Sequence, residues 1–117
     1  MNKFKDLKVY SKALIFTTTV RQAAKKFPED EIFGSTSQFK RAGDSIVLNI
    51  AGGAGSLSNK EFARFLDYSI RSGFECIGCI DIALQNDLVL KNQYDKVLTD
   101  ANEIVAMLHG LQKSIKR

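Results

Sequence analysis

The sequence predicts an all-α protein, an antiparallel four-helix bundle with up-down-up-down topology. Its 117 residues contain a single proline, so the commonest helix breaker is nearly absent. Apolar residues recur at alternating spacings of three and four through four long segments, which is the period of an amphipathic helix. The links between these segments are short, which makes sequential helices antiparallel, and no segment alternates with a period of two as a strand would.

Length and composition fit one domain spanning residues 1–117. Hydrophobic residues make up 44% and charged residues 26%, which is ordinary for a globular protein and excludes wholesale disorder. No apolar run approaches the roughly 20 residues that cross a bilayer. The first residues lack the apolar stretch of a signal peptide, so we expect a cytoplasmic protein with no membrane partner and reduced cysteines. The formal net charge of +4 favours acidic partners.

The first helix follows from a stripe of mostly apolar residues before the proline. It ends near Phe27, because Pro28 disfavours the helical conformation in the residue before it. The acidic residues 29–31 then form a connection, and Ser35 or Thr36 is the expected cap of the second helix. The stripe consists of Tyr10, Ala13, Thr17, Val20, Ala24 and Phe27.

The other three helices have equally regular stripes. The second carries Phe39, Ala42, Ile46, Ile50 and Gly53 and ends within the glycine cluster 52–55. Ser58 and Glu61 form an S-x-x-E capping box, which predicts a third helix from about Asn59 to Gln85, roughly 40 Å long. The fourth begins near Asn92 or Gln93 and uses Val97, Ala101, Ile104, Leu108, Leu111 and Ile115.

Cys76 and Cys79 have the C-x-x-C spacing of a redox or zinc motif. A redox pair requires a preceding strand and a helix N-terminus, and zinc requires further ligands, so we interpret both as small buried residues within the third helix. The glycine cluster lacks the Gly-Lys-Ser/Thr of a phosphate loop, and His109 has no recognisable nucleophile. We therefore predict no catalytic, cofactor-binding or metal-ligating residue.

Two polar lines run beside the apolar stripes. Arg41, Ser45 and Asn49 recur at intervals of four on the second helix, and Ser72 and Glu75 lie three residues apart on the third. A guanidinium can bind a carboxylate with two hydrogen bonds, so these lines predict a buried polar network that fixes register between the helices. The alternative interpretation is a catalytic or ligand pocket.

Basic residues are spread along the chain. On one small bundle they form an ordinary solvated surface, but repeated by symmetry in an oligomer they would bind nucleic-acid phosphates in a salt-dependent way. The candidates for such contacts are Arg21, Lys25, Lys26, Lys40, Lys60 and Arg64.

The second helix also carries a family resemblance. Residues 38–53, QFKRAGDSIVLNIAGG, resemble the signature Q-x-x-R-A-x-x-S-I-x-x-N-I-A-E-G of a bacterial four-helix-bundle family encoded in intervening sequences of 23S rRNA genes. Ser58, Glu61, Ser72 and Glu75 fit the same pattern, and the likeness runs from about Phe4 to Leu111. Two positions depart from it, because Gly52 replaces the usual Glu and Gly73 replaces an apolar residue.

The resemblance implies a four-helix bundle that assembles into a homo-oligomer, typically a pentamer, with no established enzymatic activity. A similar protein, the accessory variability determinant of diversity-generating retroelements, is a basic pentameric barrel that binds nucleic acid and a reverse transcriptase. Our first hypothesis is a non-catalytic oligomer that binds RNA or DNA. The alternatives are a protein-interaction scaffold and, third, an enzyme using Arg41, Asn49 and Glu75.

Overall fold

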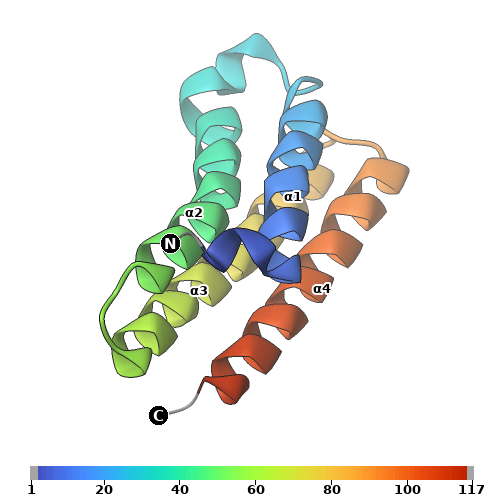
Figure 1. Ribbon diagram of the computed structural model, residues 1–117. Helices are drawn as coiled ribbons and strands as arrows, with labels where there is room; N and C mark the ends of the chain where they lie inside the picture. The colour runs from blue at the N-terminus through green and yellow to red at the C-terminus, as the bar shows by residue number, and fades with distance from the viewer. Residues whose placement is uncertain (1–2, 116–117) are drawn as a thin grey trace.

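The all-α fold is confirmed by a computed structural model that describes residues 3–115 (Figure 1). Sequential helices run in opposite directions, and the first also packs against the fourth, so the four surround a shared core. Single helical turns occur at Lys3–Asp6, Glu29–Glu31 and Ile32–Thr36. The long helices are α1 (Lys8–Ala24), α2 (Ser37–Ala54), α3 (Asn59–Gln85) and α4 (Lys91–Ser114).

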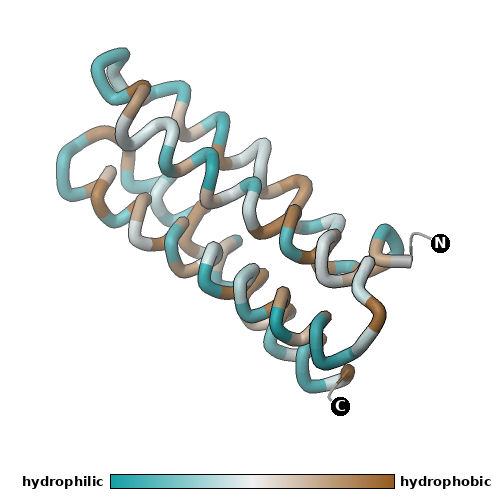
Figure 2. Tube along the Cα trace, turned by 90° about the vertical axis from the view of Figure 1, so that its left-hand side faces the viewer, coloured by the Kyte–Doolittle hydropathy of each residue, from teal (hydrophilic) through white to brown (hydrophobic). Residues whose placement is uncertain are grey.

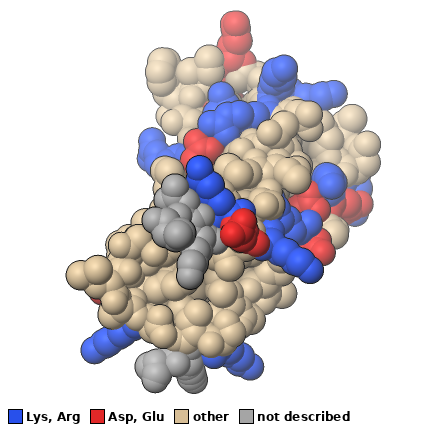
Figure 3. All heavy atoms as spheres, viewed as in Figure 1, with Lys and Arg blue, Asp and Glu red and all other residues tan. Residues whose placement is uncertain are grey.

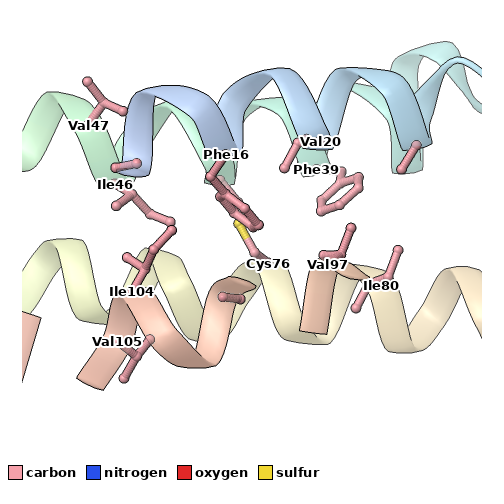
Figure 4. Close-up of a cluster of buried hydrophobic side chains, with 14 of the residues drawn as sticks. Phe16, Val20, Phe39, Ile46, Val47, Cys76, Ile80, Val97, Ile104 and Val105 are labelled. Carbon is pink, nitrogen blue, oxygen red and sulfur yellow. The ribbon is translucent and has the colours of Figure 1, made fainter. Parts of the chain in front are cut away.

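Every long helix contributes to the core, as the periodic stripes predict. Figure 2 shows apolar positions recurring between polar ones along each helix, and Figure 4 shows side chains from all four helices meeting in the interior. Phe16 on α1 is fully buried although it lies outside the predicted stripe of that helix. The buried residues of α1 include Val9, Phe16 and Ala23, each one position before a residue of the predicted stripe, so the buried face is rotated slightly from the predicted one. The largest fully buried side chains are Phe16, Phe39, Ile46, Ile50, Leu66, Ile80, Ile104 and Leu108.

The connection from α1 to α2 differs from the prediction at both ends. α1 ends at Ala24, three residues before Phe27, and the Phe27 amide then donates to the Ala24 carbonyl in a tight turn. Phe27 nevertheless remains buried and stacks on Phe39, with ring centroids 6.1 Å apart. At the start of α2, Thr36 makes no side-chain capping hydrogen bond, because the chain enters the helix from a preceding helical turn.

The glycines near the end of α2 allow α3 to approach closely. α2 continues through Gly52 and Gly53 and ends at Ala54. A β-carbon on Gly53 would lie 2.5 Å from the Phe65 β-carbon of α3, well inside carbon–carbon contact distance. Gly53 therefore has a packing role between two helices as well as lying near a helix stop.

The bounds of α3 agree with the prediction at both ends. The Ser58 hydroxyl accepts a hydrogen bond from the Glu61 amide at 3.1 Å, as the predicted cap requires. The reciprocal half of the capping box is not made, because the Glu61 carboxylate binds Arg64. The Ser69 hydroxyl, fully buried, donates to the Ile46 carbonyl of α2 at 2.8 Å and fixes the register of α2 against α3.

Candidate nucleic-acid interface

The six basic residues predicted to contact nucleic acid divide between opposite ends of the bundle (Figure 1). Lys60 and Arg64 lie in the first two turns of α3. The other four, Arg21, Lys25, Lys26 and Lys40, lie where α1 ends and α2 begins. The longest extent of the molecule is 44 Å, so a single chain presents two separate groups. Figure 3 also shows acidic side chains interspersed among the basic ones on the viewed face.

At the end where α1 stops and α2 begins, one of the four cations is paired with a carboxylate among the described residues. The Arg21 guanidinium binds Asp44 through two hydrogen bonds of 2.8 and 2.9 Å. These bonds lower the pKa of Asp44 below its usual range and raise that of Arg21. A hollow of about 370 Å³ between the helices is lined by Lys25 and Lys40 but also by Glu29. Lys25, Lys26 and Lys40 make no ion pair within residues 3–115, so this end also offers a phosphate unopposed cations, beside the carboxylate of Glu29.

At the other end, a larger hollow of about 680 Å³ lies between the start of α3 and the end of α4. Both of its carboxylates have partners, because Glu61 binds Arg64 at 2.6 Å and Asp67 accepts from the Gln112 side chain at 2.7 Å. Its two ammonium groups make no ion pair within residues 3–115. The hollow is lined by Lys60, Glu61, Ala63, Arg64, Asp67, Gln112 and Lys113.

Lys113 is a functional candidate that the sequence reasoning missed. It lies 53 positions after Lys60 and reaches the same hollow only because α4 returns antiparallel to α3. The approach of the two helices is held by Gln112, whose amide also donates to the Ala63 carbonyl at 2.9 Å. The bundle topology was predicted, but the rotation of each helix about its axis was not.

A second missed feature is an aromatic ring between two arginines on α3. The guanidinium carbons of Arg64 and Arg71 lie 5.8 and 5.9 Å from the centre of the Tyr68 ring, within cation–π range. Their spacings of four and three residues are the signal in the sequence that predicts these contacts on a helix. Tyr68 is half-buried, so part of the ring remains accessible.

The predicted buried polar network is wrong for the single chain. Arg41 and Glu75 are both exposed, and no hydrogen bond joins them within the described residues. The Asn49 amide donates to the Ser45 carbonyl at 2.9 Å, and the Ser72 hydroxyl donates to the Tyr68 carbonyl at 3.1 Å. Each of these side chains is thus satisfied by its own helix. Ser72 is buried and Ser45 and Asn49 are half-buried. Spacing placed the residues on helix flanks correctly, but it did not show that Arg41 and Glu75 lie on the outward part of these flanks.

The two cysteines lie in the middle of α3, where we expected them. Cys76 is fully buried and Cys79 half-buried, and both are free thiols. Burial raises the pKa of each thiol, which disfavours the reactive thiolate. Within residues 3–115, no cluster of three or more His, Cys, Asp or Glu side chains is placed to hold a metal ion. Across the same residues, no helix combines the length and apolar character needed to cross a membrane.

These features define a small all-α bundle with a basic hollow at one end and exposed charges along its helices. The chain belongs to the 23S rRNA-intervening sequence protein family, whose model matches residues 5–110. This membership confirms the resemblance carried by α2. No curated protein matches the sequence.

A solved structure has the same fold. It is the crystal structure, at 1.70 Å resolution, of a protein with unknown function from the S23 ribosomal protein family of Bacteroides thetaiotaomicron VPI-5482. The two chains share 24% sequence identity and superpose with a TM-score of 0.83, over 90% of this chain and 98% of the other. At that identity the likeness establishes the fold alone.

Proposed function

We propose that this protein is a non-catalytic homo-oligomer, a pentamer by family resemblance, that binds RNA or DNA through basic surface residues. The observation that carries the proposal is the hollow between α3 and α4. Its carboxylates are engaged by Arg64 and Gln112, whereas Lys60 and Lys113 have no ion-pair partner within residues 3–115. Two unopposed ammonium groups beside a concave surface suit a phosphate backbone, and the net charge of +4 supports the same partner.

Fluorescence anisotropy with labelled single-stranded RNA and duplex DNA tests the proposal at low and physiological salt. We expect binding that weakens steeply as salt rises, because phosphate contacts release counterions. The double variant Lys60→Gln/Lys113→Gln should bind at least about tenfold more weakly. On duplex DNA, the slope of log affinity against log salt concentration should be shallower by roughly 0.9 for each phosphate that the variant no longer neutralises.

The matched control is Lys25→Gln/Lys26→Gln, which removes the same charge at the other end of the bundle. An equal weakening in the two double variants would show that net charge alone drives binding and that the hollow has no special role. If the folded wild-type protein bound neither RNA nor DNA at low salt, the nucleic-acid proposal would be overturned.

The second candidate function is a protein-interaction scaffold, and exposed apolar side chains favour it. Phe33 and Leu57 project from the two connections that flank α2 and are almost completely exposed. Such side chains commonly mark contacts with other proteins. Association with a protein partner that does not weaken with salt, from a chain that binds no nucleic acid, would favour this candidate.

A further inference from the structure

An unpartnered surface lies on the outward flanks of the neighbouring helices α2 and α3. We call it the outer α2–α3 face and define it by Arg41, Leu48, Tyr68, Glu75 and Ile82. Leu48 is 66% exposed and Ile82 is 53% exposed, although both lie on helices whose other large apolar residues are mostly buried. Arg41 and Glu75 are exposed charges of opposite sign that make no ion pair within residues 3–115.

The register of the two helices places Arg41 and Glu75 at the same height. Ser69 of α3 binds the carbonyl of Ile46 on α2, and Gly53 of α2 contacts Phe65 of α3. Arg41 lies five residues before Ile46, and Glu75 lies six residues after Ser69. Because the two helices are antiparallel and each residue rises about 1.5 Å, both steps run in the same direction along the bundle and cover nearly the same length. The face is therefore ordered along the bundle as apolar Leu48, then the two charges, then apolar Ile82.

We propose that the outer α2–α3 face is the surface on which a second copy of this chain docks, with Arg41 of one copy paired to Glu75 of the next. The inference rests on the homo-oligomer of the proposed function and adds the surface that forms it. A guanidinium and a carboxylate presented at one height on neighbouring flanks are complementary between copies. Leu48 and Ile82 would be covered on either side of this pair.

The chemistry of the face fits a copy of the chain better than it fits nucleic acid. Arg71 and Glu75 lie one turn apart on α3, and Glu75 is level with Arg41, so both signs alternate within a short distance. A polyanion would be repelled by Glu75, whereas a copy of this chain carries both a carboxylate for Arg41 and a guanidinium for Glu75. Tyrosine and arginine are also enriched at the centre of protein interfaces, which is more apolar than the rest of the surface.

A hollow beside the first two-thirds of α2 supports the same occupant. This hollow, of about 530 Å³, is lined by Arg41, Ser45 and Leu48 together with Ile32, Thr36, Ser37, Lys40 and Asp44. Ile32 is itself 48% exposed. Side chains of a neighbouring copy would fill this hollow and remove the apolar atoms of Leu48 and Ile32 from water.

Light scattering on the full chain, over a range of concentrations, tests the inference with a matched pair of variants. Leu48→Glu should raise the dissociation constant of the assembly at least tenfold. Ile15→Glu is the control, because Ile15 on α1 is 69% exposed and lies outside the face. Ile15→Glu should leave the mass of the assembly unchanged. Circular dichroism on both variants checks that each remains folded.

Charge reversal tests the pairing itself. Arg41→Glu and Glu75→Arg should each dissociate the assembly, because like charges then meet across copies, and the double variant should restore it. A wild-type oligomer unaffected by Leu48→Glu and by both reversals would overturn the inference while leaving the homo-oligomer in place. A wild-type chain that is monomeric at every concentration would overturn the homo-oligomer as well.

Discussion

Adding one methyl group at Gly53 should destabilise the protein, although alanine is the better helix former. The new β-carbon would lie 2.5 Å from the Phe65 β-carbon and 3.0 Å from a ring carbon of Phe62. Favourable carbon–carbon contacts lie at about 3.5–4.0 Å, so the first overlap is roughly 1 Å. The Phe65 β-carbon is fixed to its backbone, so relief requires α2 and α3 to separate. Overpacking of this kind costs about 1–3 kcal/mol.

Gly78 supplies the control for the change in helix propensity. It lies within α3, and a β-carbon built there has no contact within 4 Å. Gly78→Ala should stabilise the protein by up to about 1 kcal/mol, since interior glycine is disfavoured by that amount relative to alanine. Gly53→Ala gains at most the same stability from helix propensity. The difference in the free energy of unfolding between the two variants therefore measures the cost of the clash with Phe65.

The assay is urea unfolding followed by circular dichroism, with all variants at one protein concentration, because the apparent stability of any protein that assembles depends on concentration. We expect Gly53→Ala to be less stable than Gly78→Ala by about 1–3 kcal/mol. If Gly53→Ala were as stable as Gly78→Ala, α2 and α3 would not approach as closely as described, and the packing role of Gly53 would be refuted.

Two further predictions follow from ionisable groups. Because Arg21 lowers the pKa of Asp44 in the folded protein, the pair stabilises the fold above the usual aspartate pKa, and this contribution disappears as pH falls through the lowered value. Asp44→Asn should remove this stabilisation, which is about 0.2–1 kcal/mol for so exposed a pair. The free energy of unfolding should then fall less steeply as the pH is lowered, and an unchanged dependence on pH would contradict the pairing. The second prediction concerns the two thiols, whose labelling by iodoacetamide at neutral pH can be followed by mass spectrometry. Cys79 should be modified before the fully buried Cys76, and both thiols should react slowly until urea unfolds the chain. Rapid labelling of Cys76 in the folded protein would contradict its burial.

Features that depend on residues close together in the chain could be predicted without the structure. A capping serine acts within one helical turn, so Ser58 located the start of α3 correctly. The three–four periodicity reports burial averaged over many turns, so it predicted an all-α protein and most core positions. It was less exact for α1, where the stripe omitted Phe16 and the helix ends three residues early.

The rotation of each helix about its own axis could not be predicted from local spacing. The spacing of Arg41, Ser45 and Asn49 showed that they share a flank of α2, but inward and outward flanks of an amphipathic helix have the same period. The rotation of each helix is fixed by contacts between residues far apart in sequence, such as Ser69 with Ile46. The same long-range packing brings Lys113 beside Lys60 and leaves Arg41 and Glu75 exposed, because it depends on side-chain shape across the core, which no local pattern encodes.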